Sequence, residues 1–357
     1  MSYNVMGVLP CGDDSTIATG SGDRFLRLLR ESANGGTTFS KGIVSTYSLV
    51  YTGTYSGGVL APNGDIHFAP WNTTVGQKIS STGVVSTYSL VYTGNSLGGV
   101  LAPNGDIHFG ARAVGQKVDL AGTVSTYSLV YTVSFAYQGG VVAPNGDIHF
   151  IPRSAPVGQK VDLAGLVSTY SLVYTGTNAY VGGVLAPNGD IHFVPWNTTV
   201  GQKINSAGAV STYSLVYASV GAYAYQGGVL SPNGDIHFVP YLATVGQKVN
   251  LAGAVSTYSL VYASAAAYYS GVLAPNGDIH FVPYLATVGQ KVNFAGVVST
   301  YSLVYTLNTG AYNGGVVAPN GDIHFIPTNA VVGQKIDTLP AVPLERSVCL
   351  SPFLNKF

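Results

Sequence analysis

The chain has 357 residues with 15 basic and 15 acidic side chains, so its formal net charge is zero. A nucleic-acid partner calls for a basic face, and a polybasic membrane contact calls for clustered Lys and Arg, so the sequence predicts neither. Charged residues are only 8% of the chain, yet no apolar run approaches the roughly 18 residues of a membrane-spanning helix. The apolar residues lie in short pieces, which is typical of buried strands.

Residues 1–41 carry no repeat and no secretory signal pattern, and the sequence leaves the compartment of the protein open. Residues 21–36 have a Ser/Asp start, apolar positions near Leu28 and a Gly end, which predict a short helix. Residues 338–357 are predicted to form a closing segment. Cys11 and Cys349 fall in these two ends, and two buried thiols are the first prediction. A disulfide between them in an oxidising compartment is the alternative.

Between the ends, three blocks recur seven times in a fixed order: a "GGVLAPNGDIHF" block, "VGQK" and "VSTYSLVY". The period is in the low forties, and it contains several short strands and no helical pattern. This combination predicts propeller blades and not a helical solenoid. The "PNGDIHF" copies start at Pro62, Pro103, Pro144, Pro187, Pro232, Pro275 and Pro319.

Each period predicts four strands. The first is "GGVLAP", and the Asn-Gly that follows predicts a two-residue hairpin turn. The second is "DIHFVP", the third is "VGQKV", and the fourth is "VSTYSLVY", which is rich in β-branched residues and Tyr. The strand Val44–Tyr51 precedes the first complete unit, so we expect it to complete the last sheet, within residues 314–336.

This pattern resembles the β-propeller superfamily over residues 42–337, through the period, the strand count and the "PNGDI" hairpin. The sequence contains no WD dipeptide and no kelch motif. The resemblance is therefore to the superfamily as a whole and not to the WD40, kelch or NHL family. The resemblance implies an all-β propeller of seven near-identical four-stranded blades. The alternative has eight blades, with degenerate segments from the two ends forming the eighth.

All seven histidines lie in the repeated heptapeptide. A plain hairpin between the second and third strands places His67 opposite Lys78, with Asp65 diagonal to Lys78. A metal site needs about three ligands, and a lysine repels a cation, so this polar cluster is predicted to be structural. We expect no metal and no cofactor. A nearly symmetric ring also supplies identical residues, whereas catalysis needs unlike groups at one place, so the strands predict no enzyme.

The repeats differ in the loops between the second and third strands and in the loops that join successive blades. In an up-and-down blade these loops share one face, and they are rich in Tyr, Trp, Ser, Gly and Asn, which suits recognition. The prediction is a non-enzymatic, multivalent, lectin-like propeller that binds carbohydrate or a protein surface. The alternative is a structural or assembly component, such as a surface or virion protein, that forms a homo-oligomer or a larger assembly. The predicted ligand-binding residues are Trp71, Trp196, Tyr241, Tyr284, Asn72 and Asn197.

Overall fold

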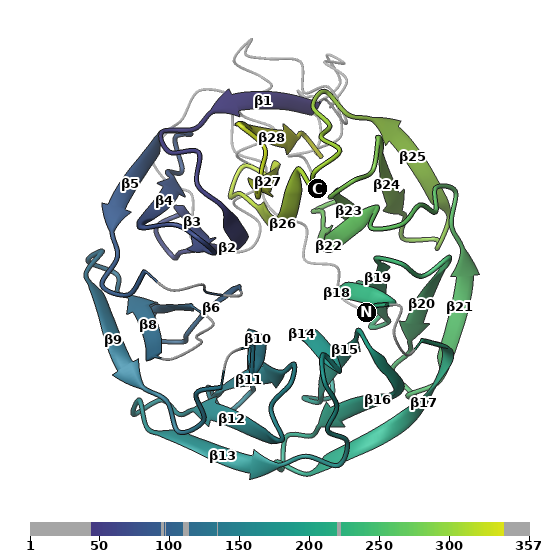
Figure 1. Ribbon diagram of the computed structural model, residues 1–357. Helices are drawn as coiled ribbons and strands as arrows, with labels where there is room; N and C mark the ends of the chain where they lie inside the picture. The colour runs from purple at the N-terminus through teal and green to yellow at the C-terminus, as the bar shows by residue number, and fades with distance from the viewer. Residues whose placement is uncertain are drawn as a thin grey trace, which may run out of the picture. The chain divides into compact units, whose positions relative to one another are not determined.

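A computed structural model describes residues 44–338, apart from 94, 95, 97, 110–113, 134 and 220–222. Seven four-stranded antiparallel sheets are arranged radially as blades around a central axis (Figure 1). Innermost strands of neighbouring blades contact one another all round the ring, and β2 contacts β26, so seven blades close it. The predicted seven-bladed propeller is confirmed. Within the described ranges there is no helix that could span a membrane.

We number the blades from 1 to 7 along the chain, starting with β2–β5, and blade 7 contains β26–β28 and β1. The innermost strands are β2 (Tyr55–Leu60), β6 (Gly99–Leu101), β10 (Tyr137–Val142), β14 (Tyr180–Leu185), β18 (Tyr225–Leu230), β22 (Tyr268–Leu273) and β26 (Tyr312–Val317). The second strands are β3 (Ile66–Pro70), β7 (Ile107–Phe109), β11 (Ile148–Pro152), β15 (Ile191–Pro195), β19 (Ile236–Pro240), β23 (Ile279–Pro283) and β27 (Ile323–Pro327). The third strands are β4 (Val75–Ile79), β8 (Val114–Val118), β12 (Val157–Val161), β16 (Thr198–Ile204), β20 (Val245–Val249), β24 (Val288–Val292) and β28 (Val332–Ile336). The outer strands are β5 (Val85–Ser89), β9 (Val124–Ser128), β13 (Val167–Ser171), β17 (Val210–Ser219), β21 (Val255–Ser259), β25 (Val298–Ser302) and β1 (Val44–Ser48).

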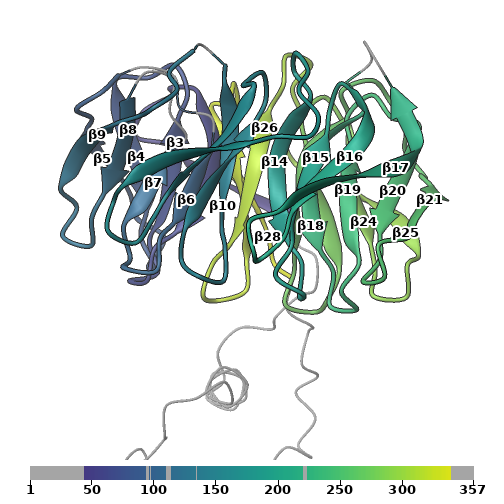
Figure 2. The ribbon, with the colours of Figure 1, turned by 90° about the horizontal axis from the view of Figure 1, so that it is seen from below.

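The strands run between the two faces of the disc (Figure 2). Because the strands of each blade are antiparallel and, in blades 1 to 6, in sequence order, the first and third turns lie on one face, which we call the turn face. The loop between the second and third strands lies on the opposite face, together with the loop that enters the next blade. We call this side the loop face.

The hairpin at the turn face differs from the predicted two-residue turn. In blade 3, Gly146 N donates to Ala143 O at 2.9 Å, and Ala143 N donates to Asp147 O at 2.8 Å. These bonds enclose a three-residue Pro-Asn-Gly loop, in which the glycine has φ +88°. Proline fixes φ near −65° at the first turn position, so Asn takes the second position and Gly takes the left-handed one.

The hydrophobic core lies between neighbouring blades. The second strands are buried on both sides, and Phe193 of β15 has no exposed surface. Between blades 4 and 5, Tyr225 and Phe238 pack against Val181 and Val194 of the preceding blade. This arrangement explains why the second strands read as a continuous apolar run with only His interrupting it.

The glycine of each "VGQK" strand is required by the outer strand. Gly201 pairs with Tyr213 across the sheet, and a Cβ built on Gly201 would lie 2.1 Å from the ring of Tyr213. The tyrosine ring therefore fills the space that a larger residue would need. The same contact recurs at the other third strands, for example between Gly158 and Tyr170.

The glutamine of each "VGQK" strand joins neighbouring blades. Gln202 in β16 of blade 4 has no exposed surface, and its Oε1 accepts the N–H of Tyr174 at 2.7 Å and that of Val173 at 3.1 Å. Tyr174 follows the outer strand of blade 3, so the bond crosses the boundary between the blades. Equivalent bonds close the ring at Tyr51–Gln77, Tyr92–Gln116, Tyr131–Gln159, Tyr217–Gln247, Tyr262–Gln290 and Tyr305–Gln334.

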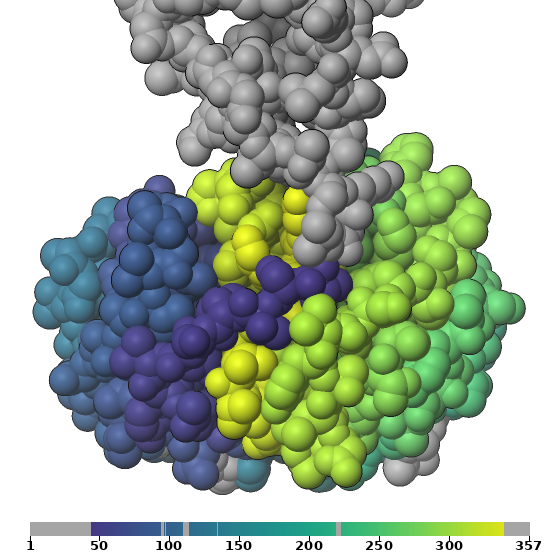
Figure 3. All heavy atoms as spheres, turned by 90° about the horizontal axis from the view of Figure 1, so that it is seen from above, coloured from purple at the N-terminus to yellow at the C-terminus, as the bar shows by residue number. Residues whose placement is uncertain are grey.

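The ring is sealed by a strand from the other end of the chain. β1 pairs antiparallel with β28, in the register Val44↔Ile336 to Ser48↔Val332. Figure 3 shows this purple strand crossing the yellow final blade. The predicted completion of the last sheet is confirmed. The predicted helix, Cys11 and Cys349 lie outside the described residues.

Candidate functional site

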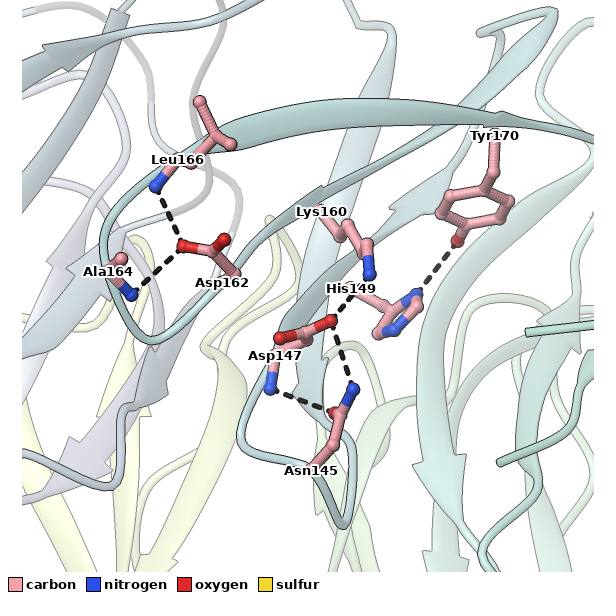
Figure 4. Close-up of polar contacts among 8 residues, drawn as sticks. All are labelled: Asn145, Asp147, His149, Lys160, Asp162, Ala164, Leu166 and Tyr170. Carbon is pink, nitrogen blue, oxygen red and sulfur yellow. Dashed lines mark hydrogen bonds and ion pairs between the residues drawn. The ribbon is translucent and has the colours of Figure 1, made fainter. Parts of the chain in front are cut away.

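A polar cluster recurs in every blade near the turn face, and Figure 4 shows it in blade 3. Lys160 Nζ lies 2.6 Å from Asp147 Oδ2, and His149 is the register partner of Lys160, as predicted. The histidine partner was not predicted: His149 Nδ1 lies 3.2 Å from the hydroxyl of Tyr170 on the outer strand. Among the residues that the structure describes, no group of three His, Cys, Asp or Glu side chains could hold a metal ion.

Burial keeps these histidines neutral. Desolvation and, to a smaller extent, the charge of Lys160 lower the pKa of His149 to about 4, and Asp147 partly opposes the shift. The other six histidines behave in the same way. The hydrogen bond to the tyrosine hydroxyl recurs in six blades. In blade 7, His324 contacts the ring of Tyr47 without a hydrogen bond at Nδ1. A neutral imidazole between a tyrosine ring and an ion pair fits a role in holding the blade together.

Two cavities lie on the turn face and are lined by repeat residues. One, of about 230 Å³, lies between blades 4 and 5 against His192, Lys203 and Leu251. The other, of about 90 Å³, lies between blades 5 and 6 against His237, Lys248 and Phe294. Because equivalent residues line both cavities, the two offer the same groups, which belong to the repeated polar cluster.

The loop face is where the blades differ. In the six blades whose second strand ends in proline, the backbone of the next residue bonds to the neighbouring loops. In blade 4, Trp196 N donates to Ala179 O at 2.9 Å, and Trp196 O accepts from Ala224 N of blade 5 at 2.8 Å. Main-chain bonds thus position this residue whatever its side chain is. Its equivalents among the described residues are Trp71, Arg153, Tyr241, Tyr284 and Thr328.

A second variable position lies at a β-bulge in the innermost strand. In blade 5 the pairing of β18 with β19 shifts between Tyr225 and Gly227, so Gln226 lies at the irregularity. A bulge turns a side chain away from the regular sheet and is over-represented next to active sites. The equivalent residues in the other described blades are Ser56, Gln138, Val181, Tyr269 and Asn313.

Backbone strain is also concentrated on this face. The described residues other than glycine with positive φ are Phe135 (+58°), Asn178 (+57°), Tyr223 (+44°) and Ala266 (+54°). All four lie two residues before the first residue of the innermost strand of a blade. Each such conformation costs on the order of 1–3 kcal/mol, and strained residues cluster at functional sites.

Arg153 is the centre of one group of these side chains. Its Cζ lies 4.8 Å from the ring centroid of Phe135 and 4.5 Å from that of Trp196, so the guanidinium contacts two aromatic rings. Its Nε donates to Asn178 Oδ1 at 2.8 Å, and Nη1 donates to Gln138 Oε1 at 3.2 Å. Arg153 was not among the predicted ligand-binding residues, so its central position was missed.

Three tyrosines form a second group. The ring centroids of Tyr269 and Tyr284 are 5.1 Å apart, and Tyr241 lies 5.9 Å from Tyr269 and 6.2 Å from Tyr284. Burial and the two neighbouring tyrosines raise the pKa of Tyr269, whereas the charge of Arg153 and a hydrogen bond with Gln138 oppose the rise. Tyr269 is therefore a neutral phenol at neutral pH. Since Gln138 is in blade 3 and Tyr269 in blade 6, the two groups meet across the ring.

The structure thus brings most of the predicted ligand-binding residues together. Tyr241 and Tyr284 contact Tyr269, and Trp196 contacts Arg153. Trp71 lies 6.4 Å from Phe135, between ring centroids, and Asn72 is exposed beside Trp71. Asn197 is partly committed to the loop, because its Nδ2 donates to Thr177 O at 3.1 Å. The ligand-binding role of these residues stays a prediction.

No protein-family model matches the chain, and a search of curated proteins finds no match. Solved structures do match its fold. A streptogramin B lyase has a TM-score of 0.74 at 16% identity, over 84% of this chain and 99% of that one. A catalytically inactive virginiamycin B lyase from Staphylococcus aureus, solved with quinupristin, gives the same TM-score and identity, over 84% of this chain and all of that one. A hydrazine synthase chain from Kuenenia stuttgartiensis has a TM-score of 0.63 at 10% identity, over 84% of this chain and 98% of that one.

These likenesses define the class of the chain as a seven-bladed β-propeller, and at such identities they establish the fold alone. They also correct the predicted function. A non-enzymatic, lectin-like propeller was predicted, with a structural or assembly protein as the alternative, but the three matching structures with TM-scores of 0.74 are lyases, which are enzymes. The prediction excluded an enzyme from the symmetry of the strands alone and considered the variable loops only as a recognition surface. The predicted lack of nucleic-acid and membrane partners and the predicted homo-oligomer stay predictions.

Proposed function

We propose that the protein is an enzyme that acts on a small organic substrate at the loop face, around Arg153, Gln138 and Tyr269. The observation that carries the proposal is the convergence of these three unlike side chains from blades 3 and 6. Catalysis requires different groups at one place, and the repeated strands supply only identical ones. The aromatic rings around the three residues suit an apolar, ring-containing substrate.

Each of the three residues has a chemical role in this proposal. The Arg153 guanidinium stabilises negative charge that develops on a substrate oxygen. The neutral phenol of Tyr269 donates a proton or a hydrogen bond to the same charge. Gln138 is a positioning residue, since it accepts a hydrogen bond from Arg153 and acts on the pKa of Tyr269.

The names of the structural neighbours favour elimination as the first reaction to test. A lyase breaks a bond without adding water, so opening a ring leaves the mass of the substrate unchanged, whereas hydrolysis adds one water. The test incubates the protein with quinupristin and with a panel of cyclic esters and amides, and follows retention time and mass by liquid chromatography and mass spectrometry.

We expect Arg153→Met to lower kcat/KM by about 10²–10³-fold, since it removes the charge and keeps an apolar side chain between the rings. Tyr269→Phe is expected to lower it by about 10²-fold through the loss of one hydroxyl. Leu163→Ser is the control, because Leu163 lies on the turn face and its side chain is 64% exposed. Full activity in both site variants, or a wild-type protein that leaves the whole panel unchanged, contradicts the proposal.

A further inference from the structure

The hairpins of the turn face carry a chemical hazard. In an Asn-Gly pair the glycine nitrogen is unhindered by a side chain, so it can attack the Cγ of the asparagine. A C–N bond forms, ammonia leaves with the proton of the glycine N–H, and the resulting succinimide is opened by water to aspartate or isoaspartate. No oxidant or further reactant is needed. The chain holds seven such pairs, which begin at Asn63, Asn104, Asn145, Asn188, Asn233, Asn276 and Asn320.

In six blades the aspartate two residues on holds both ends of the asparagine amide. In blade 3, Asp147 N donates to Asn145 Oδ1 at 3.1 Å, and Asn145 Nδ2 donates to Asp147 Oδ2 at 3.1 Å (Figure 4). The same carboxylate oxygen lies 2.6 Å from Lys160 Nζ, which fixes its position. Both bonds recur at Asn104, Asn188, Asn233, Asn276 and Asn320.

The attacking nitrogen is held as well. Gly146 N donates its hydrogen to Ala143 O at 2.9 Å, as does the equivalent glycine in every blade. Attack requires this nitrogen to lose its hydrogen-bonded proton and the asparagine side chain to rotate. Both movements break bonds of the folded hairpin, so the fold slows a reaction that the local sequence favours.

Blade 1 departs from this pattern. Asp65 N donates to Asn63 Oδ1 at 3.0 Å, and Lys78 Nζ lies 2.7 Å from Asp65 Oδ2. Among the described residues, however, the amide nitrogen of Asn63 makes no hydrogen bond to Asp65. One of the two restraints is therefore missing at this turn.

We infer that Asn63 is the site of spontaneous modification in the folded protein, and that the Asp–Lys pairs protect the other six asparagines. The lysine-anchored carboxylate thus has a protective role beyond its contribution to the sheet. The inference does not depend on the proposed enzyme activity.

The seven sites supply their own controls, because the local sequence "PNGDIHF" is identical in all of them. Wild-type protein is held in mildly alkaline buffer, once folded and once in urea, and the rate at each asparagine is measured by peptide mapping and mass spectrometry. In urea we expect seven equal rates. In the folded protein we expect Asn63 to react about tenfold faster than the others, as the loss of one hydrogen bond to a charged group predicts.

A variant then tests the protecting group. Asp147→Ala is expected to raise the folded-state rate at Asn145, relative to its rate in urea, to that of Asn63 or above, and to leave the other five protected sites unchanged. Circular dichroism checks that the variant stays folded. Equal folded rates at Asn63 and Asn145 in the wild type, or an unchanged ratio at Asn145 in a folded variant, overturns the inference.

Discussion

Acidification from neutral pH towards pH 4 is expected to unfold the propeller. All seven histidines are buried, and desolvation lowers the pKa of each from 6.5 to about 4 in the folded state. Between these two values the unfolded chain binds more protons than the folded one, so the free energy of unfolding falls as the pH falls. Well above pH 6.5 the histidines do not lower the free energy of unfolding, because they are neutral in both states. Below about pH 4 their destabilising effect has reached its maximum.

The size of the effect comes from its repetition. Each proton taken up only by the unfolded chain removes about 1.4 kcal/mol per pH unit. Up to seven such protons therefore outweigh the roughly 5–15 kcal/mol of a typical domain within a few pH units at most. Urea unfolding followed by circular dichroism at several pH values measures the slope. In His192→Gln the glutamine cannot titrate, so one fewer proton should be taken up on unfolding and the slope should fall accordingly. A free energy of unfolding that does not change down to pH 4 would contradict the prediction.

The second large effect is expected at the glutamine that joins two blades. Gln202→Met keeps the size of the side chain but removes the acceptor of the N–H groups of Val173 and Tyr174. A buried donor left without a partner costs about 1–3 kcal/mol. Val173 is exposed and Tyr174 only half-buried, so we expect the free energy of unfolding to fall by about 1–3 kcal/mol for the two bonds together.

Thr212→Val is the matched control, since Thr212 is the exposed register partner of Gln202 and should change stability by less than about 0.5 kcal/mol. Gln247→Met should reproduce the loss at the next boundary, because Gln247 makes the same two bonds. Chemical denaturation compares the three variants. A Gln202→Met protein as stable as the control would show that the bond does not couple the blades.

The parts of the fold that sequence predicted are those encoded locally and repeated. The period, the four strands, the closing strand and the pairing of His with Lys all follow from spacing within one repeat, or between the two ends of the pattern. The hairpin type was wrong, because the Asn-Gly preference was considered without the φ that Pro144 and its equivalents impose. The hydrogen bond from Tyr174 N–H to Gln202 Oε1 was not predicted, since Tyr174 lies 28 residues away in another blade.

The candidate site was predicted in part for a related reason. Aromatic residues in variable loops drew attention to Trp196, Tyr241 and Tyr284, and the structure groups all three. Arg153, Gln138 and Tyr269 were missed as a unit, because blades 3 and 6 are brought face to face only by closure of the ring. The bulge that turns Gln138 and Tyr269 out of the regular sheet leaves no mark in a strand pattern.

The strand β1 has a consequence for synthesis on the ribosome. Its partner β28 is among the last of the described strands to be made, so β1 leaves the ribosome long before that partner exists. β4, made much earlier, presents the sequence "VGQKI", which is identical to that of β28. The nascent chain therefore holds a competing partner for β1 until β5 has occupied the edge of β4, and near-identical repeats make such mispairing a general risk. The short turn that joins β4 to β5 favours the correct choice, since closing a short loop is faster and costs less entropy than holding β1 in place across a whole blade.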